Sequence, residues 1–207
     1  MDGLFLDSEP QWHLSQQELC ARYSYAWDDD DQRICIGGPL SRVGDYISDI
    51  CAHDMTGPQV AQELTEMMLV KLSTKAILMP GAFAAVERVR QVMPVALVSA
   101  SPRILMDAAL TTLPKNFFQF SISADDVTRT KPFPDPYLEA AKRMGVTTGS
   151  CVVFEDSLTG IASAKSAGCA VVAVPHYVDV ALAPKVRVVT SLEEVSLEFL
   201  AQFHSAI

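Results

Sequence analysis

The sequence lacks the features that mark secreted and membrane proteins. Its five cysteines are an odd number and include no CxxC pair, so a disulfide framework is not indicated and a reduced compartment fits best. No basic segment followed by an apolar run opens the chain, which argues against a signal peptide. No apolar stretch is long enough to span a membrane. We therefore expect a cytoplasmic protein with no membrane partner.

Positive charge is also scarce. Lys and Arg number 16 against 25 Asp and Glu, which gives a net charge of −9. A nucleic-acid partner would require a basic face, so we expect none. A small phosphorylated substrate stays possible, because a local site can be positive on an acidic protein. The acidic run at residues 28–31 indicates a solvated loop or a helix start rather than a metal site, since four adjacent side chains cannot all face one ion.

Apolar runs and helical patterns alternate in the second half of the chain. This alternation predicts a parallel sheet with helices on both faces. Gly145 and Gly168 are expected to end helices and Pro102 to open one. The expected strands are 95–99, 120–123, 151–154, 170–174 and a short one at 188–189, and the expected helices are 102–110, 136–144, 159–167 and 192–203.

The region from about Pro10 to Lys75 has few strand-like runs. A helix is predicted after the start signal at Thr56 and Pro58, and another over residues 16–27. Its Met-rich stripe indicates helix core rather than a ligand surface. We therefore predict a helical domain at residues 10–78, inserted into a sheet domain made of residues 1–9 and 79–207.

Polar residues gather where the expected strands end, and ligands of open parallel sheets bind at that edge. Each group has an ordinary structural explanation, such as a helix cap at Ser99 or a surface position for Lys131. The four groups are residues 2–9 with Asp2, Asp7, Ser8 and Glu9, residues 99–101 (Ser-Ala-Ser), Lys131-Pro132, and residues 155–157 (Glu-Asp-Ser).

Taken together, these residues fit phosphoryl transfer. That reaction needs donors and positive charge around the transferring oxygens, which Ser99 and Lys131 can supply. Mg²⁺ prefers carboxylate and carbonyl oxygens, and Glu155 and Asp156 can supply carboxylates. Asp2 can act as acid or base toward the leaving oxygen.

The motifs resemble those of the haloacid dehalogenase superfamily, in the branch of β-phosphoglucomutase-like phosphatases. That family shows DxDG(T/L)xxDSE, hhhSxS, KPxPxxY and hhEDSxxG in order, and this chain has MDGLFLDSE, LVSAS, KPFPDPY and VVFEDSLTG over nearly its whole length. The resemblance implies an α/β fold with a Rossmann-like parallel-sheet core and an inserted α-helical cap. It also implies a Mg²⁺-dependent enzyme that hydrolyses a small phosphorylated metabolite, with a sugar phosphate as one candidate.

The resemblance also implies a role for each matching residue. Asp2 corresponds to the general acid/base residue, whose backbone carbonyl contacts Mg²⁺. An acidic side chain at this position argues against a true dehalogenase. Ser99 and the Ala100 backbone correspond to the phosphate-binding pair, and Lys131 to the lysine that neutralises the phosphate and the nucleophile. Asp156 corresponds to a Mg²⁺ ligand, and Glu155 to a ligand or a neighbour of one.

One departure concerns the nucleophile. The family's attacking aspartate stands two residues before Asp2, one position ahead of Met1, and the apolar strand that precedes it is also expected to be missing from this chain. A start assigned too late and a true truncation both explain this, and in either case the chain as written is expected to be nearly inactive, because a covalent route needs its nucleophile.

The sequence is compatible with two other functions, and it does not determine the oligomeric state. A β-phosphoglucomutase-type phosphotransferase would need a second phosphate contact, for which Arg22, Arg33 and Arg42 are candidates, although surface positions are favoured for each. An inactive phosphate-binding protein is the other alternative.

Overall fold

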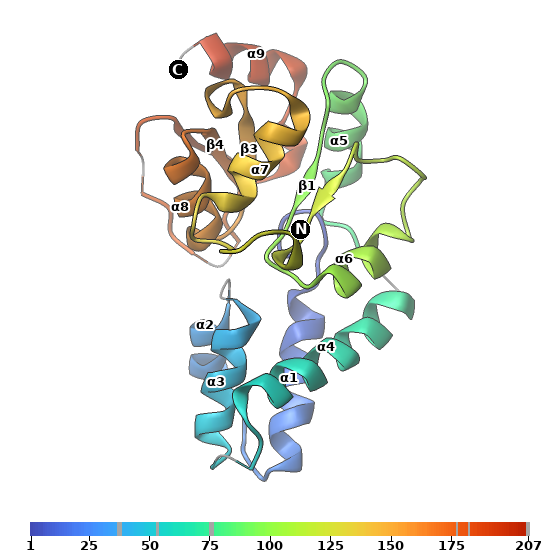
Figure 1. The fold of residues 1–207 in the computed structure, drawn as a ribbon, viewed down its shortest axis with the longest axis vertical. Coiled ribbons are helices and arrows are strands. Elements are labelled where there is room, and N and C mark those ends of the chain that lie inside the picture. The colour runs from blue at the N-terminus through green and yellow to red at the C-terminus, as the bar shows by residue number, and fades with distance from the viewer. Residues whose placement is uncertain (37–38, 53, 75–76, 177, 182, 206–207) are drawn as a thin grey trace.

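The chain folds into two lobes that meet at a waist (Figure 1). The computed structural model describes residues 1–36, 39–52, 54–74, 77–176, 178–181 and 183–205. The helical lobe comprises residues 9–74, and the strand lobe comprises residues 1–8 with 77–205. The predicted domain boundaries at residues 10 and 78 stay a prediction, although the helices of the first lobe fall close to them.

Every paired strand of the strand lobe is parallel to its neighbour, which confirms the predicted α/β fold. Within the described residues the strands form two sheets, where the sequence predicted one. The loss of the first core strand stays a prediction. One sheet pairs β1 (Leu97–Val98) with β2 (Ser121–Ile122), and the other has the order β3 (Val152–Glu155), β4 (Ala170–Ala173), β5 (Val186–Val188).

Strand β4 shows why its sequence is an unbroken apolar run. Ala170 and Val172 belong to the core cluster that contains Phe5 and Leu6, whereas Val171 and Ala173 belong to the cluster on the other face with Ile161 and Ala164. A strand buried on both faces has no polar alternation. The helices of this lobe are α5 (Ala82–Arg90), α6 (Arg103–Leu110), α7 (Asp135–Met144), α8 (Leu158–Ala167) and α9 (Leu197–Ser205), with 3₁₀ turns η1 (Ala124–Asp126), η2 (Thr148–Ser150) and η3 (Leu192–Glu194).

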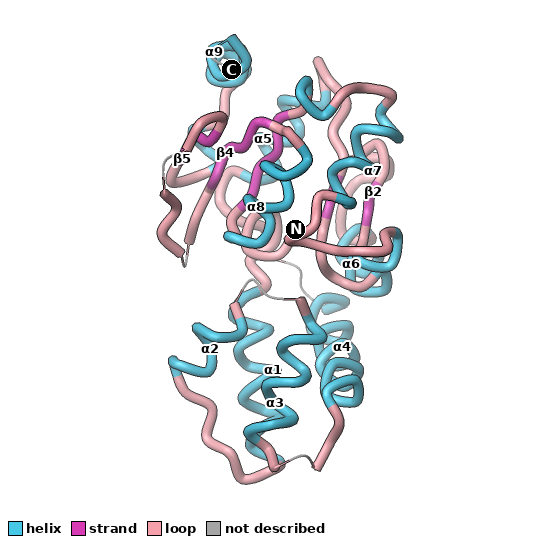
Figure 2. Tube along the Cα trace, turned by 60° about the vertical axis from the view of Figure 1, so that its left-hand side comes forward, coloured by secondary structure: helices cyan, strands magenta, loops and turns pink. Residues whose placement is uncertain are grey.

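In the described part of the other lobe, four helices surround a core of their own (Figure 2). They are α1 (Glu9–Arg22), α2 (Asp29–Cys35), α3 (Leu40–Ile50) and α4 (Gly57–Thr74). Leu19, Ile47 and Leu64 are the most deeply buried large residues of this core, at 1% exposure or less. None of the helices that the structure describes is long and apolar enough to cross a membrane.

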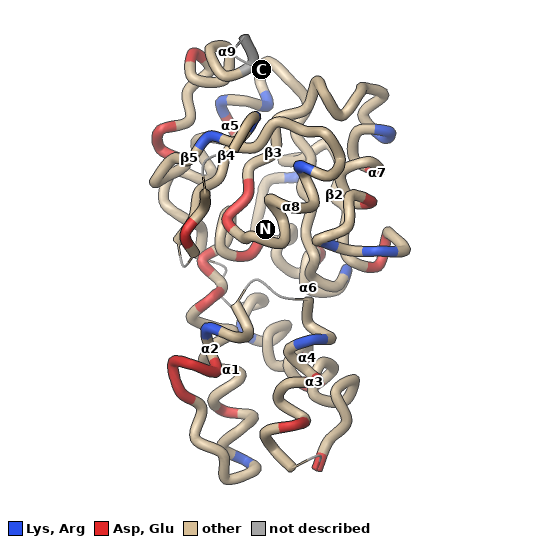
Figure 3. Tube along the Cα trace, turned by 90° about the vertical axis from the view of Figure 1, so that its left-hand side faces the viewer, with Lys and Arg blue, Asp and Glu red and all other residues tan. Residues whose placement is uncertain are grey.

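Two sequence expectations in this lobe need comment. The predicted helix at residues 16–27 is wrong at both ends, because Ser8 and Pro10 start α1 at Glu9 and the chain turns at Ser24, whose φ is 59°. The acidic run does begin a helix, as predicted. Asp28 is the N-cap of α2 and forms a capping box with Asp31, and Figure 3 shows this run in red at the start of the helix.

All five cysteines are free thiols, in line with the reduced state predicted from their number and spacing. Cys20, Cys35, Cys51 and Cys169 are buried, and Cys151 is half-buried. They serve as small apolar residues of the two lobes.

Candidate active site

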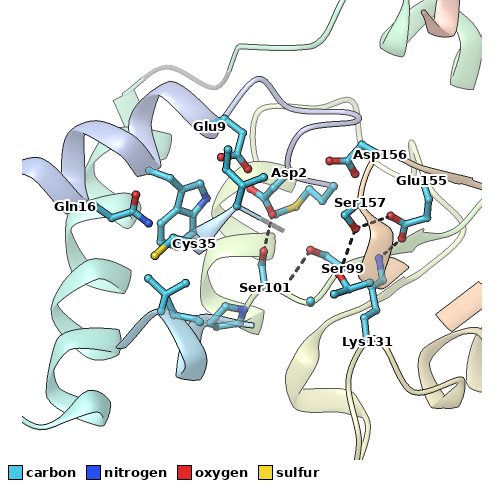
Figure 4. A pocket seen from close by; sticks show the side chains of 18 of the residues that line it. Asp2, Glu9, Gln16, Cys35, Ser99, Ser101, Lys131, Glu155, Asp156 and Ser157 are labelled. Atoms are coloured by element: carbon cyan, nitrogen blue, oxygen red, sulfur yellow. Dashed lines mark hydrogen bonds and ion pairs between the residues drawn. The ribbon is translucent and has the colours of Figure 1, made fainter. Parts of the chain in front are cut away.

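A pocket opens between the lobes, at the carboxyl ends of β1 and β3 (Figure 4). About 820 Å³ of empty space lies within it, open solvent at the mouth included. The strand lobe lines it with Met1, Asp2, Ser99, Ala100, Ser101, Pro102, Lys131, Glu155, Asp156, Ser157 and Thr159, and the helical lobe with Glu9, Trp12, Gln16, Gln32, Cys35, Ile36, Leu40 and Val43.

Ser99 follows β1 directly and is almost fully buried. Its Oγ accepts a hydrogen bond from the backbone N–H of Ser101 at 3.1 Å. Its own N–H donates to the carbonyl of Ile122, which ties it to β2 at 2.9 Å. The sheet therefore holds this serine rigidly at the pocket floor, with Ala100 beside it.

Lys131 and Glu155 form a buried ion pair at the same floor. The Lys131 ammonium also donates to the carbonyl of Val98 at 3.3 Å, and the hydroxyl of Tyr137 donates to the same Glu155 oxygen that Lys131 contacts. Burial alone would raise the pKa of Glu155, but the charge of Lys131 and the hydrogen bonds from Lys131 and Tyr137 hold it below its ordinary value. Burial, followed by the charge of Glu155, raises the pKa of Tyr137.

Asp2 is held by two hydroxyl groups from different parts of the chain. Ser8 Oγ donates to one carboxylate oxygen at 2.6 Å, and Ser101 Oγ donates to the other at 2.5 Å. Ser8 is the N-cap residue of α1, yet its side chain makes no capping bond to that helix, since its hydroxyl proton goes to Asp2. The orientation of the Asp2 carboxylate in the pocket is therefore fixed from two sides.

Asp156 and Glu9 bring further negative charge to the pocket. Burial, followed by the charge of Glu155, raises the pKa of Asp156 to about 6. Burial, followed by the charges of Asp2 and Asp156, raises the pKa of Glu9 to about 7. Figure 3 shows the acidic segment at the end of β3 beside the N-terminus. Carboxyl groups crowded in this way gain from a bound cation.

The structure brings every predicted site residue to this one pocket: Asp2, Ser99, Ala100, Lys131, Glu155 and Asp156 all line it. The sequence also named Ser8, Glu9 and Ser101, but gave them no role. It placed Tyr137 in the expected helix 136–144 and missed its hydroxyl, although the tyrosine of the KPFPDPY motif was the available signal. Gln16 and Gln32 had no signal, because a polar residue on a helix is usually solvated.

Carboxylates, a lysine and hydroxyl groups gather at the carboxyl edge of the parallel strands, an arrangement that suits a hydrolase with an α/β fold. A sequence model of the haloacid dehalogenase-like hydrolases matches residues 1–174, and the chain belongs to this family, in its phosphatase branch.

Named relatives agree with this assignment. Fructose-1-phosphate phosphatase of Escherichia coli is 31% identical over 81% of this chain and 89% of its own. Hexitol phosphatase B of the same species is 30% identical over 84% of this chain and 81% of its own. Among solved structures, β-phosphoglucomutase of Clostridium difficile has the same fold, with a TM-score of 0.81 at 21% identity over 99% of this chain and 94% of its own.

Proposed function

We propose that this phosphatase hydrolyses the phosphate ester of a small metabolite, with Mg²⁺ and through an aspartyl-phosphate. One observation supports this more than any other: residues from four separate motifs meet at one pocket, with Ser99 and Lys131 on its floor and Asp2 and Asp156 beside them.

In the proposed site, Ser99 and the Ala100 N–H bind phosphate oxygens and Lys131 offsets their charge. Such preorganised donors act where charge develops in the transition state. Glu155 holds Lys131 in place, and Tyr137 holds Glu155. The Lys131 ammonium is therefore oriented at the pocket before a substrate binds. Asp2, held by Ser8 and Ser101, gives a proton to the leaving oxygen.

Mg²⁺ fits the acidic side of this pocket. Among the described residues, no three His, Cys, Asp or Glu side chains form a ready metal cluster. Mg²⁺ does not require one, since it commonly takes one or two carboxylates with water and substrate phosphate. Asp156, with its raised pKa, would be a ligand, with the Asp2 carbonyl and Glu155 as the other proposed contacts. The ion would offset negative charge on the phosphate oxygens.

The attacking carboxylate is proposed to belong to an aspartate joined directly ahead of Met1. Met1 is buried and lines the pocket, and burial, followed by the charge of Lys131, lowers the pKa of its amino group. A residue joined there would enter the pocket near Lys131. Its carboxylate would form a bond to phosphorus as the ester P–O bond breaks, and water would then release inorganic phosphate and free the carboxylate.

The relatives support a sugar or polyol phosphate as substrate, because two of them are named for fructose 1-phosphate and for hexitols. The pocket favours hydrolysis over the mutase alternative. Arg22, Arg33 and Arg42 are absent from its lining, and Arg22 and Arg33 pair instead with half-buried Glu63 and exposed Asp30. The described residues of the lining therefore include no arginine for a second phosphate.

The test uses the chain extended by an apolar strand that ends in Phe-Asp, a matched chain with Asn at the added Asp position, and the 207-residue chain itself. Each is assayed against sugar phosphates and p-nitrophenyl phosphate, with Mg²⁺ or with EDTA. Only the Asp-extended chain should turn over, only with Mg²⁺, and Asp156→Ala should abolish that turnover. Equal turnover by the Asn-extended chain or by the unextended chain would contradict the covalent route, and a strong stimulation by a hexose bisphosphate would favour the mutase.

A further inference from the structure

The first turn of α1 brings two side chains of different chemistry to the pocket. Glu9 is the first residue of this helix and Trp12 follows three residues later, and both line the pocket. Side chains three residues apart lie on the same face of a helix, so the carboxyl group and the indole ring are neighbours. Figure 4 shows Glu9 next to Asp2 and away from Lys131.

Glu9 presents a carboxyl group without a partner in the described structure. The residue is half-buried, and no hydrogen bond to another described residue influences its carboxyl group. Its oxygens remain accessible, because the fully buried polar atoms that lack a partner among the described side chains are Gln16 Oε1 and Thr130 Oγ1. A ligand in the pocket can therefore contact the Glu9 carboxyl group.

The charges that act on Glu9 are negative. They come from Asp2, Asp156 and Asp7, and they add to burial in disfavouring an ionised carboxylate at this position. A positively charged group of a ligand would offset these charges, because opposite charges attract strongly where little water separates them. A neutral hydroxyl group would leave the negative charges without compensation.

Two cationic side chains near the pocket act on other groups. Lys131 forms its ion pair with Glu155 at the floor. Arg42 is exposed in the first turn of α3, and its charge acts on Cys35. Neither residue is among the groups that influence Glu9. A ligand can therefore supply the countercharge that these two side chains do not bring to Glu9.

Trp12 suits the same kind of ligand. Part of its side chain packs against the apolar cluster of Met68, Leu72 and Leu105, and the half-buried residue also lines the pocket. None of the cation–π contacts between described residues involves this ring. Among side-chain rings, indole attracts a ligand cation most strongly. A carboxyl group and an indole ring on one helix face therefore favour a protonated amine over a hydroxyl group.

We propose that Glu9 and Trp12 form a subsite for a protonated amine, so that the pocket prefers phosphate esters of amino sugars and amino alcohols to their hydroxyl counterparts. This inference rests on the proposed function, since it requires the phosphate group to occupy the floor at Ser99 and Lys131. The amine forms an ion pair with Glu9 and lies against the Trp12 ring. Both residues determine specificity through the alcohol part of the substrate, and neither takes part in phosphoryl transfer.

The experiment measures binding by titration calorimetry with Mg²⁺ present, so that it does not depend on turnover. Two pairs of ligands each differ by one amine or hydroxyl group: glucosamine 6-phosphate with glucose 6-phosphate, and phosphoethanolamine with 2-hydroxyethyl phosphate. In at least one pair the amine should bind about tenfold more tightly than its hydroxyl counterpart, the usual effect of a hydrogen bond between charged groups. Inorganic phosphate is the reference ligand for the phosphate floor.

Three variants assign the preference to its residues. Glu9→Gln keeps the size of the side chain and removes its charge, and it should abolish the preference for the amine. Trp12→Leu removes the ring and should reduce the preference about threefold. Glu18→Gln, the same change at an exposed residue of α1 outside the lining, should leave the preference as it is. Thermal melts check folding, and Glu9→Gln should melt no lower than the unchanged chain, because it removes a carboxylate crowded by negative charges.

The outcomes separate the inference from the proposed function. Equal affinities within both pairs, or a preference for the amine that survives in Glu9→Gln, would overturn the inference alone. Weaker binding of inorganic phosphate by Glu9→Gln would also overturn it, because Glu9 would then act at the phosphate or Mg²⁺ site. Failure of the unchanged chain to bind inorganic phosphate and all four esters would contradict the phosphate site and the subsite together.

Discussion

At the scale of single residues, the floor of the pocket depends on one buried carboxylate. Glu155 is 3% exposed and accepts from both Lys131 and Tyr137. An ion pair at this depth keeps its charges only where hydrogen bonds offset the loss of water. The Tyr137 hydroxyl is therefore expected to stabilise the ionised pair as well as the packing.

Tyr137→Phe should lower the free energy of unfolding by about 1.5–3 kcal/mol, the usual value of a hydrogen bond to a charged group. Urea unfolding measures this change. Tyr23→Phe is the matched control, because the Tyr23 ring packs on the helical core and no hydrogen bond of its hydroxyl appears in the described structure. Equal stability of the two variants would show that the Tyr137 hydroxyl contributes little.

The sequence identified Lys131 and Glu155 but could not predict that they pair. Their motifs lie 24 residues apart, and whether a carboxylate faces a metal or a lysine depends on distances that only the packed fold sets. The same holds for Ser8 and Ser101, which meet on Asp2 from positions 6 and 99 residues away from it in the sequence. Local sequence patterns predict which residue types follow the strands, but their hydrogen-bond and ion-pair partners depend on tertiary contacts.

At the scale of elements, helix α8 begins against the same carboxylate. Gly160 lies in its first turn, and a Cβ placed there would overlap the Glu155 carboxylate. The glycine of the hhEDSxxG motif is thus explained by the close approach of a strand end and a helix rather than by a turn. The carboxylate cannot move aside without leaving Lys131 and Tyr137.

Gly160→Ala should therefore destabilise the protein by about 1–3 kcal/mol, as overpacking does. In a helix with free space around the glycine, the same substitution stabilises the protein by about 1 kcal/mol. The sign of the change in the free energy of unfolding therefore shows whether the close contact exists. Gly149→Ala is the control, since a Cβ there meets nothing within 4 Å. Urea unfolding together with phosphate titration measures both variants, and a Gly160→Ala chain more stable than the unchanged one would refute the close contact.

The same scale shows which helices the sequence could reveal. Helices α7 and α8 were predicted to end at Gly145 and Gly168, and both residues adopt the left-handed conformation there, with φ of 70° and 89°. Helix α3 was not predicted, and Gly44 lies on its buried face. A glycine is required there because a Cβ at position 44 would overlap the carbonyl oxygen of Gly57, which is distant in the sequence. Helix propensity gave no hint of this long-range constraint.

At the scale of the whole molecule, a small apolar cluster joins the two lobes. Met68 and Leu72 of α4 pack with Leu105 of α6, and all three are 2% exposed or less. Trp12, which lines the pocket, packs against the same cluster. Since residues of both lobes form the pocket, this cluster is expected to set the distance between the phosphate floor and the helical-lobe residues that line the pocket.

Leu105→Ala tests that coupling. The cavity it leaves should lower the free energy of unfolding by about 2–4 kcal/mol, whereas Ile104→Ala, one residue earlier and 52% exposed, should change it by at most about 0.5 kcal/mol. Both tryptophans of the chain, Trp12 and Trp27, lie in the helical lobe, so their fluorescence reports on that lobe while far-UV circular dichroism reports on all helices. In the unchanged chain the two urea transitions should coincide, and in Leu105→Ala they should separate, because the lobes then lose their shared core. Coincident transitions in Leu105→Ala, or a loss of stability no larger than that of Ile104→Ala, would show that the lobes are coupled by other contacts.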